Sequence, residues 1–320
     1  MHITILTEPK EYSRQAIATL RTLGPVVSWQ EARRRPATLK RATILAVKLG
    51  MKISAPLMDR LPRLKIIGTS TTGLNHIDMA EAKRRGIGVV SLRGETKFLK
   101  TIFPTAEETI GLAIMLIRNL HTGYEGVRQG KWRKQQCYGH ELYRKTLGII
   151  GFGRLGSIVA RYGRAFGMEV IACDPFVSTR AMARLGARKV TMDTLFKRAD
   201  IVTNHVLHTS KTTNLVTRRH FRMMKPTAYY INTARGEIND EPALLRALQK
   251  KWIAGAALDV LANEDPRGRH IHHHPLVRYA TRRRNLIIVP HLGGATFESM
   301  AKTEELIAER IVERLRTSKE

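Results

Sequence analysis

The expected fold of this chain is decided by the stretch LGIIGFGRLG, residues 147–156. Its spaced glycines, Gly151, Gly153 and Gly156, follow a short apolar run and precede a helix-like segment, residues 157–166. In such a unit the first glycine permits a tight turn, the second lets the backbone approach a pyrophosphate, and the third allows helix and strand to pack closely. The stretch therefore predicts a dinucleotide-binding strand, turn and helix, with the anion at the N-terminus of the helix.

A second apolar run, residues 170–173, ends in Asp174, which lies 18 residues beyond Gly156 (174 − 156). An acid at this place accepts hydrogen bonds from the adenosine ribose of NAD and repels the additional phosphate of NADP. Arg180, a few residues later, is the feature that favours NADP. We expect NAD as the cofactor and NADP as the less favoured alternative. The alternative interpretation is that the stretch binds no ligand. It is then an ordinary glycine-rich turn from a strand to a helix, and Asp174 caps a helix.

The length and composition predict a folded protein with two ordinary domains. Hydrophobic residues make up 43% of the 320 residues, which is typical of a globular chain. No apolar run approaches the roughly 20 residues that span a bilayer, and the first residues lack the features of a secretory signal. We therefore expect a cytoplasmic protein without a membrane span. Cys137 and Cys173 have neither a disulfide nor a metal-site spacing, so we interpret both as structural.

The charge balance is strongly basic, because 55 Lys and Arg stand against 27 Asp and Glu, a formal net charge of +28. The basic residues form short clusters along the chain, for example residues 33–35, 83–85, 218–219 and 282–284. One interpretation is nonspecific binding of a polyanion, such as nucleic acid or an anionic membrane surface, through salt-sensitive contacts. The other is a solvated surface, which we favour because the chain has no nucleic-acid-binding motif.

Alternating apolar runs and amphipathic segments predict an α/β fold with two doubly wound parallel sheets. We expect a Rossmann NAD-binding domain, residues 101–292, inserted in a discontinuous flavodoxin-like substrate domain, residues 1–100 and 293–320. An apolar helix at about residues 105–120 is expected to connect them, and a closing helix at about residues 295–316 to return to the first domain. Besides the two strands above, predicted strands are 3–6, 43–47, 65–69, 88–90, 200–204, 228–232, 255–259 and 286–289, and further predicted helices include 11–23, 78–85 and 241–250.

Three ionisable residues follow the late strands: Arg235 in INTARG, Glu264 in ALDVLANEDP, and His291 in VPHLGG. Ligands of such sheets bind at the carboxyl ends of the strands. A cation at this edge can bind an anionic ligand, and a histidine beside an acid can exchange a proton with it. Taken alone, each residue has an ordinary alternative: a surface cation, a turn-capping acid and a hydrogen-bonded histidine at a strand end.

These segments, together with the glycine fingerprint and with TTGLNHID at residues 71–78, resemble the D-isomer-specific 2-hydroxyacid dehydrogenases over almost the whole chain. The resemblance implies that Arg235 binds the substrate carboxylate and carbonyl, that His291 exchanges the proton, and that Glu264 hydrogen-bonds His291 and favours its imidazolium form. It implies a small 2-keto or 2-hydroxy acid as substrate, with phosphoglycerate, glyoxylate and hydroxypyruvate types all open. It also implies a homodimer built around residues 110–116, whose apolar face is alternatively part of the chain's own core.

The resemblance extends to cofactor and substrate contacts. Asp259 matches an acid near the nicotinamide carboxamide, and Thr233 and Ala234 match the turn that lines the nicotinamide ring. For the substrate, Lys48 matches a basic position, and backbone amides at Thr72 and Gly73 match a loop that binds carboxylate. The other matching cofactor positions are Gly151, Gly153, Arg154, Leu155, Gly156, Asp174, His205, Val206 and Gly293. The alternatives are a helix-capping role for Asp259 and a solvated Lys48.

The histidine run at residues 270–274 suggests a metal site. We favour a polar loop, because relatives often carry His-Pro-Leu where this chain has residues 274–276. The Glu at position 264, where the formate-oxidising branch carries Gln, argues against that branch. The chain ends at Glu320, so we expect no appended regulatory region of the kind found in longer phosphoglycerate dehydrogenases.

Four residues depart from the usual pattern of the family. Asp265 stands where Pro often follows the Glu, Leu207 and His208 replace a common Pro-Leu pair, and Glu108 replaces a frequent His. None of these changes removes one of the three predicted catalytic groups. His208 either contacts the cofactor or faces solvent.

The function that we predict is an NAD-dependent D-2-hydroxyacid dehydrogenase that works as a reductase of a small 2-keto acid. One alternative is an NAD(H)-sensing binding protein, as in the corepressor relatives, with the basic surface engaging nucleic acid or another polyanion. Another is a dehydrogenase of phosphite or a similar oxyanion on the same scaffold. The intact set of Arg235, Glu264 and His291 favours the 2-keto acid enzyme.

Overall fold

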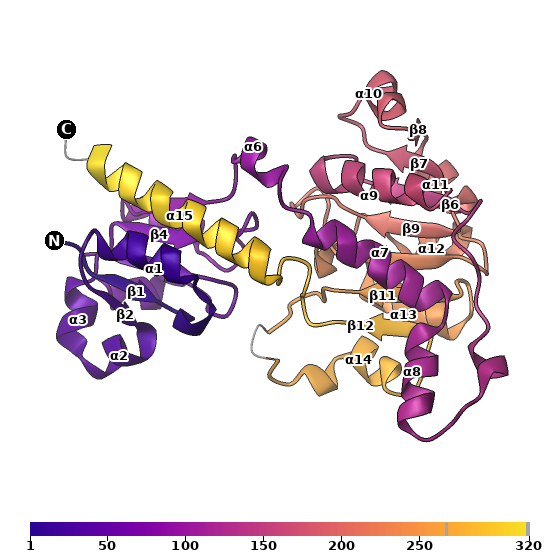
Figure 1. Cartoon of the computed structure of the whole chain (residues 1–320), viewed down its shortest axis with the longest axis horizontal. Helices are drawn as coiled ribbons and strands as arrows, with labels where there is room; N and C mark the ends of the chain where they lie inside the picture. Colours follow the sequence, from indigo (N-terminus) through magenta and orange to yellow (C-terminus); the bar gives the residue numbers. More distant parts are fainter. Residues whose placement is uncertain (266–267, 318–320) are drawn as a thin grey trace. The chain divides into compact units, whose positions relative to one another are not determined.

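The computed structural model, which describes residues 1–265 and 268–317, forms two compact α/β units (Figure 1). Unit 1 comprises Met1–Ile102 together with the C-terminal segment from Ala295, and unit 2 comprises Phe103–Gly294. Unit 2 is therefore an insertion in unit 1. The chain passes from unit 1 to unit 2 after Ile102 and returns after Gly294.

Unit 1 is built on a five-stranded parallel sheet with the strand order β2-β1-β3-β4-β5. Strands β1, β3 and β4 are buried throughout, which explains their continuous apolar sequences. The sequence predicted every strand of this unit except β2, a half-buried edge strand of three residues. The bounds are β1 Thr4–Leu6, β2 Val26–Ser28, β3 Ile44–Val47, β4 Ile66–Thr69 and β5 Gly88–Ser91.

The helices of unit 1 contribute to two hydrophobic clusters. The C-terminal helix α15 belongs to this unit because Ile307, Ile311 and Leu315, spaced four residues apart, are buried in one cluster with Leu20 of α1 and Ile66 of β4. The predicted return of this helix to the first domain is thus observed. The bounds are α1 Arg14–Arg21, α2 Trp29–Arg34, α3 Pro36–Arg41, α4 Ala55–Asp59, α5 Met79–Arg84, α6 Thr96–Leu99 and α15 Phe297–Thr317, with a 3₁₀ turn at Pro9–Glu11.

Unit 2 contains a seven-stranded parallel sheet with the strand order β12-β11-β10-β9-β6-β7-β8. The chain runs outward from β6 to β8 on one side, crosses back to β9, and then runs outward to β12 on the other side. The direction of winding reverses between β6 and β9, and ligands bind outside the carboxyl ends of the strands at such a point. The bounds are β6 Thr146–Ile150, β7 Glu169–Cys173, β8 Arg188–Lys189, β9 Ile201–Asn204, β10 Tyr229–Asn232, β11 Gly255–Leu258 and β12 Leu286–Ile288.

Helices pack against both faces of the unit 2 sheet and form two buried clusters. One cluster contains apolar residues of α7, α9 and α10, and the other contains Phe196, Phe221 and Leu244 from α11, α12 and α13. No helix in the described part of the chain is long and apolar enough to cross a membrane. The bounds are α7 Pro104–Ile117, α8 Leu120–Arg128, α9 Arg154–Ala165, α10 Thr179–Arg184, α11 Met192–Arg198, α12 Arg218–Met223, α13 Glu241–Gln249 and α14 Pro275–Ala280, with 3₁₀ turns at Lys134–Cys137, Gly236–Ile238 and Ile271–His273.

The helix predicted at about residues 105–120 is α7, which ends somewhat earlier, at Ile117. Asn119 adopts a left-handed conformation with φ 52°, and α8 begins at the next residue. Helix α8 was not predicted, because it lies in the polar segment that follows the predicted helix. Residues Ile110, Ala113 and Leu116 of α7 are buried in the core of unit 2, which is the alternative that the sequence left open for this apolar face.

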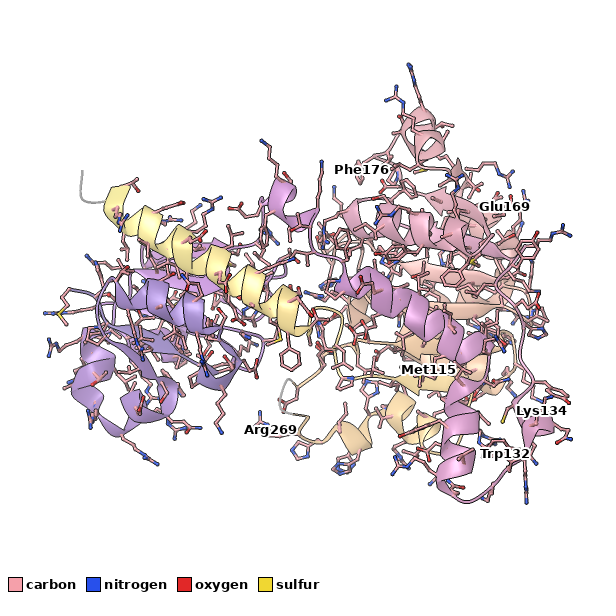
Figure 2. All side chains as sticks on the ribbon, in the orientation of Figure 1. Met115, Trp132, Lys134, Glu169, Phe176 and Arg269 are labelled. Carbon is pink, nitrogen blue, oxygen red and sulfur yellow. The ribbon has the colours of Figure 1, made fainter. Side chains whose placement is uncertain are left out.

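A matched pair of Phe→Ala variants tests the packing of unit 2. Phe196 is 0% exposed, whereas Phe176, labelled in Figure 2, is 95% exposed. Phe196→Ala is expected to lower the free energy of unfolding by about 3–5 kcal/mol, because it removes a buried ring and leaves a cavity. Phe176→Ala is expected to change it by less than about 0.5 kcal/mol. Chemical denaturation measures both values, and equal losses would contradict the assignment of Phe196 to the core.

Candidate active site

The glycine fingerprint forms the turn between β6 and the N-terminus of α9, as the sequence predicted. A Cβ atom at Gly156 would lie 2.1 Å from the carbonyl oxygen of Gly151, so only glycine allows this contact of helix and turn. A Cβ atom at Gly153 would meet no atom within 4 Å. Gly153 is the N-cap of α9, and the space beside it suits an anion at the N-terminus of a helix. The turn therefore fits the pyrophosphate of a dinucleotide.

Asp174 follows β7 and lies next to this turn. Its Oδ2 accepts a hydrogen bond from the Phe152 amide at 2.8 Å, and its Oδ1 accepts one from the Phe176 amide at 2.8 Å. These bonds hold the carboxylate at the carboxyl end of β7, on the adenosine side of a Rossmann unit. The pKa of the Cys173 thiol is raised by burial and by the charge of Asp174, so the thiol stays protonated. Arg180 is exposed on α10.

The remaining predicted cofactor residues lie at the carboxyl ends of β6, β9 and β10. The His205 imidazole is buried, which lowers its pKa to about 3, and its Nε2 lies 3.0 Å from the Thr203 hydroxyl. It is therefore neutral at physiological pH. The Thr233 hydroxyl lies 2.9 Å from that of Thr109. Arg154, Leu155, Val206 and Ala234 are all half-buried.

Asp259, at the end of β11, is 2% exposed and organises the segment that follows β12. Its carboxylate accepts hydrogen bonds from the amides of Leu292 and Gly293. Its carbonyl oxygen also accepts a bond from the His291 amide at 2.9 Å. The amides of Leu292 and Gly293 belong to a loop and not to the first turn of a helix. Asp259 therefore does not cap a helix, the alternative role considered for it from the sequence. The contacts determine the position of the His291 backbone, which has a left-handed φ of 56°.

The His291 and Glu264 side chains form the pair that the resemblance implied. The Nδ1 atom of His291 is hydrogen-bonded to Oε1 of Glu264, and the Leu261 amide donates to Oε2 of Glu264 at 3.3 Å. The two side chains are 24% and 32% exposed. Since Glu264 engages Nδ1, the Nε2 atom of His291 is the ring nitrogen available to a ligand. An imidazole that a carboxylate orients through a hydrogen bond can donate and accept a proton at its other nitrogen.

Arg235 is placed by the buried amide of Asn232 at the end of β10. The Asn232 side chain donates to the carbonyl of Arg235 at 2.8 Å and accepts from the Ala234 amide at 3.0 Å. These two bonds stabilise the turn that carries Arg235. The guanidinium donates to the carbonyl of Ala234 at 2.6 Å. No carboxylate among residues 1–265 and 268–317 forms an ion pair with it. The half-buried cation therefore retains N–H donors for an anionic ligand.

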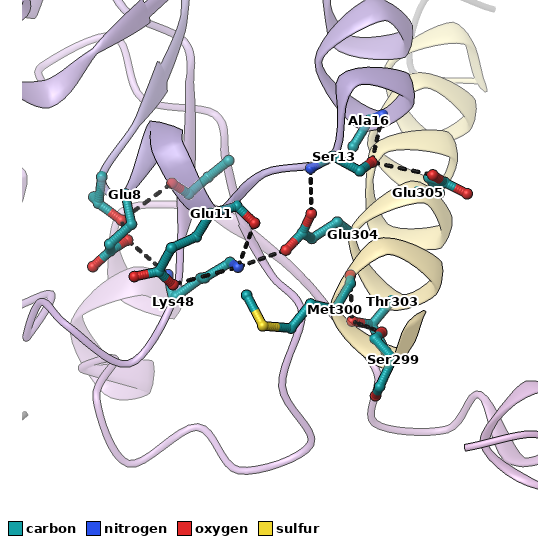
Figure 3. Close-up of polar contacts among 12 residues, drawn as sticks. Glu8, Glu11, Ser13, Ala16, Lys48, Ser299, Met300, Thr303, Glu304 and Glu305 are labelled. Atoms are coloured by element: carbon teal, nitrogen blue, oxygen red, sulfur yellow. Dashed lines mark hydrogen bonds and ion pairs between the residues drawn. The ribbon is translucent and has the colours of Figure 1, made fainter. Parts of the chain in front are cut away.

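In unit 1, Lys48 follows β3 and the loop with Thr72 and Gly73 follows β4, so both lie at the carboxyl edge of that sheet. Figure 3 shows that the Lys48 ammonium lies 2.5 Å from Oε1 of Glu304 on α15 and 2.9 Å from the carbonyl of Glu11. Lys48 is therefore paired within its own unit rather than solvated. The sequence did not predict that Glu304 pairs with Lys48. The only indication in the sequence was an acidic residue on the apolar face of the C-terminal helix.

The histidine run at residues 270–274 forms a loop and a 3₁₀ turn before α14. His272 and His273 are exposed, and His274 lies 3.2 Å from a carboxylate oxygen of Glu241. Within the residues that the structure describes, no group of three or more metal-ligating side chains is brought together.

Known proteins with similar sequences place this geometry in a family. A profile described as "D-isomer specific 2-hydroxyacid dehydrogenase, NAD binding domain" matches residues 110–293. The chain belongs to this family. It is 36% identical over 269 residues to a D-3-phosphoglycerate dehydrogenase of Synechocystis, covering 83% of this chain and 46% of that protein. It is 35% identical over 279 residues to one of Methanocaldococcus jannaschii, covering 87% and 51%.

Solved structures with the same fold cover both units of the chain. A D-lactate dehydrogenase from Aquifex aeolicus, complexed with NAD and lactic acid, aligns with a TM-score of 0.83 and 28% identity over 99% of this chain and 96% of that one. The TT0316 protein from Thermus thermophilus aligns with a TM-score of 0.81 and 29% identity, over 98% and 97%. The chain spans about half the length of the curated phosphoglycerate dehydrogenases that it matches.

Two glycine variants separate the structural and binding roles of the fingerprint. Gly156→Ala is expected to lower the free energy of unfolding by about 2 kcal/mol or more, because the added Cβ would overlap a backbone oxygen. Gly153→Ala is expected to change stability by less than about 0.5 kcal/mol. It is expected to weaken NADH binding about tenfold or more, since the methyl group enters the space for the pyrophosphate.

Thermal unfolding and fluorescence titration with NADH measure these effects. If Gly153→Ala binds NADH as tightly as wild type does, the pyrophosphate does not bind at this turn.

Proposed function

We propose that the chain is an NAD-dependent D-2-hydroxyacid dehydrogenase that reduces small 2-keto acids. The observation that carries the proposal is the hydrogen bond between His291 and Glu264 at the carboxyl edge of the unit 2 sheet. The same edge carries Arg235, which has no carboxylate partner in the described residues, and the Gly153 turn that fits a pyrophosphate. A proton donor, a cation and a dinucleotide turn are the groups that this reaction requires.

The nicotinamide, when bound, supplies the hydride that reduces the carbonyl carbon. Arg235 would bind the substrate carboxylate and polarise the carbonyl with its fork of N–H donors. His291 would donate a proton from Nε2 to the carbonyl oxygen as it becomes a hydroxyl, and would accept that proton in the oxidation direction. Glu264, bonded to Nδ1, would hold the ring and stabilise its imidazolium form.

We assign the substrate-domain role to unit 1 and the NAD-binding role to unit 2. Backbone amides at Thr72 and Gly73 would bind the substrate carboxylate; the Thr71 hydroxyl, which donates to the Gly73 carbonyl at 2.7 Å, supports the shape of their loop. Lys48 is proposed to stand beside the substrate, although the buried Glu304 already compensates its positive charge. The net charge of +28 favours an anionic substrate. The relatives named D-3-phosphoglycerate dehydrogenase make phosphohydroxypyruvate the first substrate to test.

Turnover and its dependence on His291 test the proposal. NADH oxidation is measured against phosphohydroxypyruvate, hydroxypyruvate, glyoxylate and pyruvate. His291→Ala is expected to lower kcat by about 10²–10⁴-fold, because it removes the proton donor. Its NADH affinity is expected to stay within about twofold of wild type, since the imidazole acts on the substrate. The exposed His273, changed to Ala, is the matched control and should leave both quantities unchanged. Equal turnover by wild type and His291→Ala would overturn the assignment.

Asp174 is proposed to select NAD over NADP. Asp174→Ala is expected to weaken NAD binding about tenfold and NADP binding less, because the carboxylate attracts the ribose hydroxyls and repels the additional phosphate. Arg180→Ala is the companion variant, and it should weaken NADP only if that side chain holds the phosphate. Titration calorimetry with both cofactors gives the affinities. An equal loss of both in Asp174→Ala would mean that Asp174 only supports the turn through Phe152.

The basic composition supports a second candidate, an NAD(H)-sensing protein that binds a polyanion through its surface. Salt-dependent retention on nucleic acid, NADH binding and no turnover on any 2-keto acid would favour it. Oxidation of phosphite in place of 2-hydroxy acids would favour an oxyanion dehydrogenase instead.

We also propose a cytoplasmic homodimer. In the part of the chain that the structure describes, α8 and the segment after it expose Leu120, Tyr124, Val127 and Trp132, of which Trp132 is 88% exposed (Figure 2). Exposed apolar side chains grouped in this way are typical of a subunit interface. They adjoin α7, whose Ile110 and Leu116 face the chain's own core. A monomeric mass in solution would contradict the proposal.

A further inference from the structure

Two carboxyl groups converge on the backbone of Gly293 in unit 2. One belongs to Glu108 on α7, and the other to Asp259 at the end of β11. A Cβ atom added to Gly293 would lie 3.0 Å from Oδ2 of Asp259 and 3.0 Å from Oε2 of Glu108. Two acidic side chains from elements far apart in the sequence therefore contact the same residue.

The two carboxyl groups differ in their hydrogen-bond partners. Asp259 accepts from two backbone amides, as described above. Both oxygens of Glu108 are buried, and no N–H or O–H donor of the described residues is hydrogen-bonded to them. The nearby hydroxyls are used elsewhere: that of Thr105 donates to the Gly293 carbonyl at 2.8 Å, and that of Thr109 to the Thr105 carbonyl at 2.7 Å.

A buried carboxylate with no donor and a second carboxylate beside it is strongly disfavoured, and protonation of one partner removes the conflict. We propose that Glu108 carries a proton directed at Asp259, and that this carboxyl pair sets the charge beside the nicotinamide end of the dinucleotide site. The inference rests on the proposed function for the identity of the cofactor. It makes Glu108 a positioning residue that acts through Asp259.

The topology of the sheet places the pair at the nicotinamide end. The pyrophosphate turn follows β6, and Asp174, on the adenosine side, follows the neighbouring β7. A dinucleotide that extends across the switch point from β7 therefore places its other half toward β9, β10 and β11. Asp259 stands at the carboxyl end of β11, and its backbone positions His291.

The charge of the pair depends on pH in a defined direction. Burial and the charge of Asp259 raise the pKa of Glu108 to about 8. Below that pH the pair carries one negative charge, and above it two. The additional charge attracts the cationic nicotinamide of NAD⁺ more than the neutral ring of NADH. The ratio of NADH to NAD⁺ dissociation constants is therefore expected to rise with pH.

The groups around Glu108 explain why this one acid titrates. From β11 it faces Asp259, whose pKa is raised by burial, against the lowering effects of the two amides and of the charge of His291 in the segment after β12. Of the two acids only Asp259 accepts hydrogen bonds from amides, so the proton resides on Glu108. The end of β10 presents the neutral hydroxyl of Thr233 to α7. Helices α8 and α9 also pack on α7, and their described residues place no charge that shifts the pKa of Glu108.

Cofactor affinities of Glu108→Gln test the proposal. The glutamine keeps an N–H donor for Asp259 at every pH and cannot ionise. In wild type the ratio of NADH to NAD⁺ dissociation constants is expected to rise about tenfold between about pH 6.5 and about pH 9.5, and in Glu108→Gln to stay within about twofold. The matched control is Glu107→Gln, because Glu107 is exposed on the same turn of α7 and should behave as wild type. A wild-type pH profile in Glu108→Gln would overturn the proposal.

A cofactor-free measurement separates this inference from the proposed function. The native state holds a proton on Glu108 up to about pH 8, whereas the unfolded state releases it near 4.5. Wild type should therefore lose stability relative to Glu108→Gln as pH rises between these values, and the difference should be constant above pH 8. Infrared spectra of wild type should show a protonated carboxyl band that disappears near pH 8. A pH-independent stability difference or the absence of this band would overturn the proposal, even if the protein binds NADH.

Discussion

The candidate site of unit 2 depends on the buried carboxylate of Asp259. Its hydrogen bonds to two amides after β12 join the ends of two neighbouring strands. Because its carbonyl also holds the His291 amide, the backbone carries His291 in a left-handed conformation toward Glu264. Glu108, which approaches the same carboxylate from α7, is proposed to hold a proton there. Asp259 therefore contributes both to the position of His291 and to the proposed charge of the carboxyl pair.

The parallel arrangement of the unit 2 sheet explains how distant residues converge. All strand pairs are parallel, so every strand ends at the same edge. Gly153, Arg235, Asp259 and His291 each follow a different strand at that edge. The glycine turn, the Arg235 guanidinium and the His291 imidazole therefore all lie at one edge of the sheet, each shortly after its strand. Unit 1 uses the same principle for Lys48, whose charge is compensated by the buried Glu304.

Much of the fold was predictable because buried parallel strands have continuous apolar sequences. The pattern identified β3, β4, β9 and β10 to within a residue or two. It did not identify β2, whose residues are half-buried at an edge. It placed the end of α7 at about residue 120 instead of Ile117, because the end depends on the backbone conformation of Asn119 rather than on a change of hydrophobicity.

The sequence by itself determined the family, the dinucleotide turn and the identity of the residues proposed to react, because these depend on residue types at set spacings after strands. Only the tertiary structure decided which groups are paired. Lys48 meets Glu304, and Glu108 meets Asp259, across separations for which no local pattern exists. The protonation of a carboxyl group depends on burial and on neighbouring charges. These are properties of the packed chain, so Glu108 appeared in the sequence only as a departure from the family pattern.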